Sequence, residues 1–235
     1  MPDLVEAASA ILAQAERRTE IVGENIANAS APAYKRRIAF SSLVSPTDAS
    51  RPVETQVLTA IDFGPGKLVE TNNPYDFAIA GTGFFALRQG EDIRFSRAGR
   101  FTRRNDGRLV DTLSGVLQQA NGGDVIVSDA IFEVRSDGQI FQDGSEIGKV
   151  AIYDAPVLGS LVPISGGFSD SSGSLGLSAQ ASVKQGTYEA SNVSTGEEMV
   201  TMMQALRMAE SGQRVMIIYD DLMGRVISTF GENVR

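Results

Sequence analysis

The chain contains no cysteine, no histidine and no tryptophan among its 235 residues. It therefore lacks the thiolate and imidazole ligands of most zinc and copper sites, and it lacks the usual base of a nucleophilic triad. The absence of cysteine also leaves no disulfide, which suits the cytoplasm and equally suits a protein that is exported unfolded. Carboxylates remain as the main groups for catalysis, and we expect neither a metal site nor a cofactor.

Positive charge and long apolar runs are also scarce. The formal net charge is -8, which opposes binding to nucleic acid and favours protein partners. The most apolar short run, residues 215–219, is followed by Asp220 and Asp221 and is far shorter than the roughly 20 residues of a membrane span. The first sixteen residues carry Asp3 and Glu6 but no basic residue, unlike a secretory signal. We therefore expect no membrane insertion and no cleaved signal peptide.

A helical pattern opens the chain. Apolar and small residues recur there at alternating steps of three and four, and Arg18 interrupts them. The pattern predicts an amphipathic helix over about residues 3–28, with a seam rich in alanine that lets another helix approach closely. The seam residues are Leu4, Ala8, Ile11, Ala15 and Val22.

The same spacing returns at the other end of the chain. Thr195 and Glu198 form a capping-box signature, so a helix is predicted from near residue 196 to about Phe230. Gly212 and Gly224 indicate close packing or a bend inside it. Its methionines suit a surface that fits several neighbours, although an ordinary core is the alternative. The seam residues are Met199, Met202, Leu206, Ala209, Met216, Met223 and Ile227.

Between the helices the apolar period changes to two, and Asp-Gly pairs at residues 106–107, 137–138 and 143–144 indicate hairpins. Short strands are expected at residues 77–80, 84–88, 99–103, 109–111, 131–135, 139–141 and 150–153. A mostly antiparallel β domain is therefore predicted for the centre of the chain.

The predicted fold class is α+β, with long N- and C-terminal helices forming a coiled-coil-like pair. The predicted domains are an N-terminal helix and motif loop (1–40), an extended connection (41–74), a central β domain (75–185) and a C-terminal helix (186–235). A Gly- and Ser-rich stretch at 165–178 reads as a long loop. Periodicity alone leaves open whether the two helices pair with each other or with neighbouring subunits.

Three motifs could suggest a chemical site. Residues 81–83, Gly-Thr-Gly, precede an aromatic strand and no helix, so they predict a turn and not a dinucleotide site. Six arginines between residues 94 and 108 favour contact with protein or solvent over nucleic acid in so acidic a chain. Asp76 follows Asn-Asn-Pro and is typical of a turn. We expect no enzyme, with a carbohydrate-processing β domain as the alternative.

One segment at the end of the first predicted helix carries a recognisable signature. Residues 24–37, ENIANASAPAYKRR, resemble the N-x-A-N-x-x-T-x-G-[YF]-K signature of flagellar rod and hook proteins. The segment departs from it at Ala31 and Ala33, where that family usually has Thr and Gly. The matching residues are Asn25, Ala27, Asn28, Tyr34 and Lys35.

Three further blocks resemble the same family in the same order along the chain. They are GKLVETNNPYDFAIAGTGFFAL at 66–87, RFSRAGRFTRRNDGRLV at 94–110 and EASNVSTGEEMVTMM at 189–203. With the N-terminal signature they cover both ends and the centre of the chain.

The resemblance implies a structural subunit of the bacterial flagellar basal-body rod, which polymerises through its terminal helices and transmits torque. It also implies export through the flagellar type III apparatus, a place in the rod across the periplasm, and other rod proteins and copies of itself as partners. The short chain favours the proximal rod, with the distal rod as the alternative. A secreted adhesin or effector with coiled-coil ends is the alternative of a different class. The predicted assembly interface consists of Leu4, Ile11, Val22, Asn25, Asn28, Tyr34, Met199, Met202, Leu206, Met216 and Met223.

Overall fold

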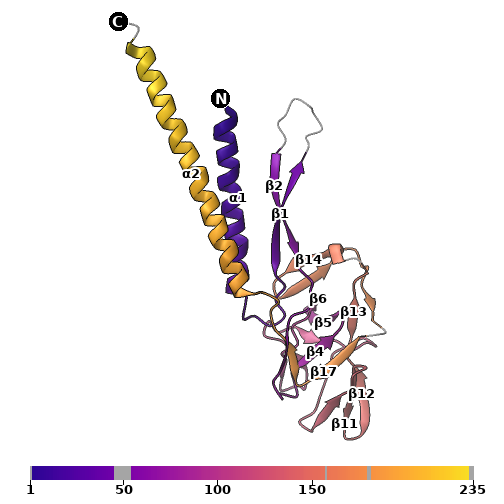
Figure 1. Cartoon of the computed structure of the whole chain (residues 1–235). Helices are drawn as coiled ribbons and strands as arrows, with labels where there is room; N and C mark the ends of the chain where they lie inside the picture. Colours follow the sequence, from indigo (N-terminus) through magenta and orange to yellow (C-terminus); the bar gives the residue numbers. More distant parts are fainter. Residues whose placement is uncertain (1, 45–53, 157, 179–180, 233–235) are drawn as a thin grey trace. The chain divides into compact units, whose positions relative to one another are not determined.

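The computed structural model describes residues 2–44, 54–156, 158–178 and 181–232 (Figure 1). The chain divides into two compact units, each assembled from segments that are distant in sequence. The helical unit contains Met1–Asn28, Arg36–Asp62 and Val193–Arg235, and the β unit contains Ala29–Lys35 and Phe63–Asn192.

The helical unit consists of two helices and one hairpin. Helix α1 spans Pro2–Ala27 and helix α2 spans Thr195–Glu232. Strands β1 (Arg37–Val44) and β2 (Glu54–Ile61) pair antiparallel, with Arg37 opposite Ile61. Figure 1 shows the indigo α1 beside the orange and yellow α2. Both terminal helices that the periodicity predicts are therefore present.

Alanine makes α1 a strong helix former, because it loses no side-chain entropy in a helix. The helix ends where the Asn28 side chain donates through Nδ2 to the Glu24 carbonyl at 2.8 Å. Pro32 follows and lacks the N–H that a continuing helix needs. Ala33 then adopts a φ of 57°, a left-handed conformation that favours glycine. Alanine therefore adopts, at the position where the signature has glycine, a conformation that glycine adopts without strain.

The structure differs from the extended connection predicted over residues 41–74. That range contains the end of β1, all of β2 and strand β3 (Leu68–Glu70). Pro65 and Pro74 lie outside these strands and do not interrupt them, so the prolines of this range do not exclude strands from it. Residues 45–53, within the same range, lie outside the described part of the chain.

The β unit is built from short strands, and every strand pair in it is antiparallel. Besides β3, its strands are β4 (Phe77–Ala80), β5 (Phe84–Gln89), β6 (Asp92–Ser96), β7 (Thr102–Arg103), β8 (Leu109–Val110), β9 (Val116–Leu117), β10 (Phe132–Val134), β11 (Gln139–Gln142), β12 (Ser145–Lys149), β13 (Ile152–Asp154), β14 (Leu161–Ile164), β15 (Gly167–Asp170), β16 (Gly176–Leu177), β17 (Ser182–Gln185) and β18 (Thr187–Glu189). A short 3-10 helix occupies Leu158–Ser160.

The largest sheet has nine strands, with the order β14-β15-β6-β5-β9-β8-β7 and with β13 and β16 joined at β5. Strands β10, β11 and β12 form a second sheet, and β17-β4 and β18-β3 form two-stranded sheets. Strands β15 and β16 lie inside residues 165–178, so the long loop predicted there is wrong in part. The glycine and serine content resembles that of a linker, although β15 forms a hairpin with β14 and its Phe168 is buried.

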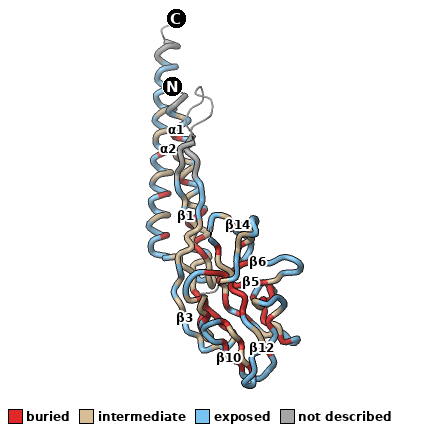
Figure 2. The backbone as a smooth tube through the Cα atoms, turned by 90° about the vertical axis from the view of Figure 1, so that its right-hand side faces the viewer, coloured by how far each residue is buried: buried red, intermediate tan, exposed pale blue. Residues whose placement is uncertain are grey.

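Aromatic side chains fill the core of the β unit. Phe77 and Phe85 each stack on Phe101, with ring centroids 5.7 and 5.8 Å apart, and all three are fully buried. Aliphatic residues of β5, β8 and β9 surround them. Figure 2 shows the resulting concentration of buried backbone in this unit and the exposed positions along α2. The α+β class with mostly antiparallel sheets is confirmed. None of the described helices is long and apolar enough to cross a bilayer.

Candidate assembly interface

The two helices pack against each other through small residues at steps of seven. Ala8 and Ala15 of α1 and Ala205 of α2 are almost fully buried. Gly212 follows Ala205 by seven, and a Cβ added to Gly212 would lie 3.1 Å from Leu12 Cγ. The α2 backbone therefore approaches α1 closely, which explains the glycine that weakens the helix on its own. The close approach that the alanine-rich seam predicts is present.

The helices run antiparallel. Asn25, at the end of α1, bonds to Glu198 in the first turn of α2, whereas Gly212, further along α2, faces Leu12. Counting back from Leu12 at the same rise per residue, the start of α1 reaches about the level of Leu222. The described part of α2 continues for about 15 Å beyond that level. This end of α2 has no part of α1 opposite it.

The predicted interface residues of the helices do not share one surface. Val22 is buried, whereas Ile11, Met202 and Met216 are half-buried. The others point outward, with exposed fractions of 49% for Leu4, 54% for Met199, 50% for Leu206 and 37% for Met223. The spacing predicts one apolar stripe on each helix, but alternating steps of three and four also fit residues that lie on two adjacent faces. The alanines and Gly212 form the inner face, and the larger side chains lie beside it or outside it.

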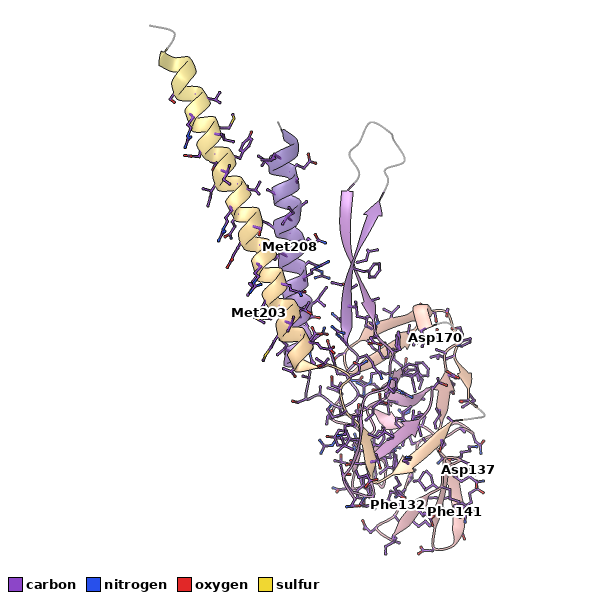
Figure 3. All side chains as sticks on the ribbon, viewed as in Figure 1. Phe132, Asp137, Phe141, Asp170, Met203 and Met208 are labelled. Carbon is purple, nitrogen blue, oxygen red and sulfur yellow. The ribbon has the colours of Figure 1, made fainter. Side chains whose placement is uncertain are left out.

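Several apolar residues that the sequence analysis did not single out enlarge the outer surface of α2. They occupy positions adjacent to the predicted seam, and Figure 3 labels Met203 on this helix. The sequence of α2 indicates this second surface, because it has more large apolar residues than one helical stripe can contain. The missed residues are between 47% and 59% exposed, apart from Ile217 at 67%, and are Val200, Met203, Ile217, Ile218, Leu222 and Val226. Together with Met199, Leu206 and Ile227 of the predicted seam they form the outer face of α2.

A polar cluster joins the ends of the helices to β1. The buried Asn25 side chain accepts from the Arg37 N–H at 2.9 Å and donates to the Arg37 carbonyl at 2.8 Å. Its Nδ2 also donates to Glu198 Oε2 at 3.1 Å. Only an amide side chain of this length both donates and accepts here, and Asp at this position would place a second carboxylate beside Glu198.

The Glu198 carboxylate has a different role from the predicted capping box. It is 1% exposed and accepts from Arg36 Nε at 2.5 Å in addition to Asn25. The Arg36 and Arg37 side chains thus both end on carboxylates of the helical unit, because Arg37 Nη1 lies 2.6 Å from Glu24 Oε2. Opposite charges at 2.5–2.6 Å form strong hydrogen bonds that fix the start of α2 against the end of α1 and the start of β1.

The loop that follows α1 is held inside the β unit by a second buried cluster. Lys35 Nζ lies 2.7 Å from Glu189 Oε1 and Arg97 Nη1 lies 3.1 Å from Glu189 Oε2. Glu189 Oε1 also accepts the Gly66 N–H at 2.8 Å, and the Ala33 N–H donates to the Glu189 carbonyl at 2.8 Å. Two cations and an amide therefore compensate the burial of one carboxylate.

The remaining predicted loop residues, Asn28 and Tyr34, are half-buried. Asn28 caps α1, and the Tyr34 carbonyl accepts the Asn192 N–H at 3.3 Å. The sequence blocks contained Arg97, Glu189 and Glu198, but no sequence pattern revealed that they are buried. A fully buried acid in a strand or helix can be recognised only when its cation is located.

Groups that could have suggested catalysis have structural partners. Asp76 accepts from Thr71 Oγ1 at 2.7 Å and from Asn73 Nδ2 at 3.2 Å, which confirms the predicted turn. Gly81 and Gly83 have φ values of 112° and 113° in the turn that leads into β5, also as predicted. Among the described residues no group of three or more acidic side chains could hold a metal ion.

Asp124 shows how the exposed arginines are used. Arg88 binds it through two nitrogens and Arg108 Nε lies 2.9 Å from it. Burial alone raises the pKa of Asp124, but hydrogen bonds from Arg88 and Gln118 and the charges of Arg88 and Arg108 outweigh burial and lower it below its usual range. This cluster ties the loops of the sheet together and presents no reactive group.

Two family models match the chain. Residues 184–229 match the flagellar basal body rod FlgEFG protein C-terminal model, which includes most of α2. Residues 78–142 match the flagellar hook protein FlgE/F/G D1 domain model, which covers much of the β unit. The outer face of α2 and Phe85 and Phe101 of the aromatic core thus lie in matched regions.

The chain is also similar over most of its length to two rod proteins. It is 26% identical to the flagellar basal-body rod protein FlgF of Caulobacter vibrioides, over 92% of this chain and 93% of that protein. It is 25% identical to the rod protein FlgG of Bacillus subtilis, over 91% and 93%. The chain is 33% identical to the flagellar hook protein FlgE of Brucella melitensis, but this match covers only 61% of this chain and 38% of that protein.

Proposed function

Because this chain belongs to the family of flagellar basal-body rod and hook proteins and is FlgF-like, we propose that it is a structural subunit of the rod that polymerises through its terminal helices. The family consists of structural components of the flagellum, and the chain is not an enzyme. Its location is the flagellar basal body, and its partners are other flagellar rod or hook proteins.

The outer face of α2 is the observation that carries the proposal. The outer face exposes large apolar side chains in two groups, at residues 199–206 and at residues 217–227. Exposing Met, Leu, Ile and Val to water is costly, and soluble monomers rarely carry large apolar patches without a partner. Small residues already occupy the α1 side of the helix, so the larger side chains remain for helices of neighbouring subunits. The end of α2 beyond Leu222 also needs a neighbour. Subunits arranged around one axis would bury both, in a coiled-coil-like tube.

In this proposal residues 1–40 and 186–235 form the polymerisation domain, and residues 75–185 form an outer layer. The loop around Asn28 and Tyr34 sets the contact between the layers, because the Lys35–Glu189 pair holds that loop in the β unit. The rod crosses the periplasm, the subunit reaches it through the flagellar type III apparatus, and torque passes through the buried contacts.

Replacing Leu206 by Asp tests the polymerisation surface. Leu206 is half exposed, so its replacement leaves the fold of both units intact in the monomer. The charge cannot be buried between helices, and we expect loss of incorporation into isolated basal bodies and loss of motility. Gln204→Asp on the same helix adds the same charge at an exposed polar position and serves as the matched control. Normal motility of the Leu206→Asp variant contradicts the proposal.

Within the rod we propose the proximal position, on the similarity to FlgF proteins. The comparable similarity to FlgG supports the distal position as a second candidate. Electron microscopy of basal bodies from a deletion strain distinguishes them: loss of the rod above its base supports the proximal position, and loss of its outer part alone supports the distal one.

A further inference from the structure

The arginine-rich segment of residues 94–108 has a role that the helical interface does not explain. Arg94 and Arg97 are buried and paired with Asp111 and Glu189. Arg103 pairs with Asp129, and Arg108 pairs with Asp124. The exposed members that remain are Arg100 and Arg104.

Arg100 and Arg104 flank β7, the last strand at one end of the nine-stranded sheet. The Arg100 guanidinium lies over the Tyr188 ring at 5.1 Å, and Arg104 forms no ion pair with the residues that the structure describes. The backbone just before β7 is already paired, because Arg100 bridges Asp76 and the Phe101 N–H donates to the Tyr75 carbonyl at 3.3 Å. This end of the sheet therefore presents positive charge at the turn between β7 and β8.

The opposite end of the same sheet contains a groove of about 680 Å³. It forms because β15 pairs with β6 only at Phe168 and Phe95, whereas β5 follows β6 along its whole length. Among the described residues, no strand pairs with the outer edge of β6 from Asp92 to Arg94.

The groove is apolar on its walls and acidic at its rim. Ile93 and Ile164 line it with 39% and 44% of their surfaces exposed. Asp92 and Asp170 supply negative charge at its edge, and Figure 3 labels Asp170. A hydrogen bond from the Leu175 N–H lowers the pKa of Asp170, followed by bonds from Ser172, so this carboxylate is ionised at neutral pH.

The positive charge nearest the groove is already neutralised. Arg94 is 2% exposed and bonds to Asp111 and to the Ser165 carbonyl, the latter at 3.1 Å. Its Nε has no acceptor among the described residues, but this atom is buried and is not accessible from the groove. The rim of the groove therefore keeps its negative charge and fits a segment that carries arginine.

We infer that this groove receives the β7–β8 turn of a second copy of the chain, with Arg104 of one copy against Asp92 of the next. The inference rests on the proposed function, since it names a second contact between rod subunits. The two surfaces lie at opposite ends of one sheet, so the contact is head-to-tail and leaves both outer ends free. Such heterologous contacts build open helical polymers and not closed dimers.

The absence of cysteine from the chain provides a direct test. Gln89 lines the groove and Asn105 follows Arg104, and both are exposed. We expect the full-length Gln89→Cys/Asn105→Cys variant to give a ladder of dimers, trimers and longer species with a short bismaleimide cross-linker. Glu133→Cys/Asn105→Cys, with an exposed cysteine on β10 in place of the groove position, is the control and gives no ladder.

Charge reversal separates a specific contact from accidental collision. In the cross-linking variant, Asp92→Lys alone or Arg104→Asp alone reduces the ladder by about tenfold, because like charges then face each other. The two changes together in one chain restore it. Absence of the ladder, an equal ladder from the Glu133 control, or failure of the double reversal to restore cross-linking overturns the inference.

The Leu206→Asp variant distinguishes failure of the groove contact from failure of the proposed assembly through α2. No ladder, combined with exclusion of Leu206→Asp from the rod, refutes the groove contact and leaves the helical assembly in place. A ladder combined with normal rod incorporation of Leu206→Asp supports the groove contact and refutes assembly through α2.

Discussion

The two units of this chain bury apolar surface in opposite ways. In the β unit the largest apolar side chains, such as Phe77, Phe85 and Phe101, are fully buried inside one chain. In the helical unit alanine and glycine occupy the contact, and large side chains such as Leu206 and Ile217 stay 50% and 67% exposed. Burial per residue within the chain is therefore much greater in the β unit.

This difference separates the stability that a unit has within a single chain from the stability that it gains by contact with other subunits. A core of aromatic residues supplies several kcal/mol for each side chain, about the amount that a small domain needs to fold alone. A seam of alanines supplies little, and isolated helices in water are marginal. We therefore expect the helical unit to depend on neighbouring subunits for its stability and the β unit to be stable without them.

The largest expected effect is on the core of the β unit. Replacing Phe85 by Ala removes a side chain that is fully buried against Phe101, and it should lower the free energy of unfolding by about 3–5 kcal/mol. Denaturant titration of the purified monomer measures this change. Leu206→Ala on the outer face of α2 is the comparison and should change monomer stability by less than about 0.5 kcal/mol. Equal losses in the two variants would remove the distinction between the units.

A smaller effect is expected at the helix contact. Leucine at Gly212 would collide with Leu12 and Ile11 and should destabilise the helix pair by about 1–3 kcal/mol. At Gly224 an added Cβ meets no atom within 4 Å, so leucine there should increase helicity, since it is the better helix former. Thermal melting followed by circular dichroism compares them. A Gly212→Leu variant as stable as Gly224→Leu would show that the seam contributes nothing in the monomer.

Asp124 extends the comparison to the surface of the β unit. Its pKa is lowered by bonds and charges that outweigh burial, so it stabilises the fold above its unfolded pKa and loses this contribution as pH falls through its lower folded pKa. Asp124→Asn should cost about 1–2 kcal/mol at pH 7. The difference from the parent chain should shrink below about pH 4. Urea titrations at pH 7 and pH 3 test this, and a difference that does not depend on pH would exclude the role of the charge.

The smallest effect concerns the loop after α1. Ala33 has a φ of 57°, which glycine adopts without the steric cost that alanine has there. Ala33→Gly should stabilise the β unit by about 0.5–1 kcal/mol, because the relief of strain exceeds the added entropy of the unfolded chain. Denaturant midpoints of the two proteins provide the measurement. A destabilised variant would mean that the left-handed turn is not under strain.

The sequence was most informative where one periodicity dominated. Both terminal helices and strands such as β4 and β5 could be predicted because apolar residues repeat at steps typical of each element. The hairpin of β1 and β2 was missed because prolines and polar residues surround it. Strands β15 and β16 were missed because glycine and serine resemble a linker.

The candidate interface was predictable in its location but not in its division into faces. The spacing does not distinguish the helix face that contains Ala205 from the adjacent face that contains Leu206, yet Ala205 is buried and Leu206 is half exposed. The choice between them depends on the close approach at Gly212, which is a tertiary property. The clusters around Glu189 and Glu198 also join residues more than 150 positions apart, and spacing along the chain contains no such information.

Hydrogen exchange of the purified monomer, compared with the same chain in isolated basal bodies, tests the central claim most directly. In the monomer, amides of the β unit core from β4 to β9 should exchange slowly and those of α2 beyond Gly212 should exchange quickly. In the assembled state, the α2 amides should become protected while those of the β core change little. Protection of α2 in the monomer equal to that of the β core, with no gain on assembly, would contradict the account.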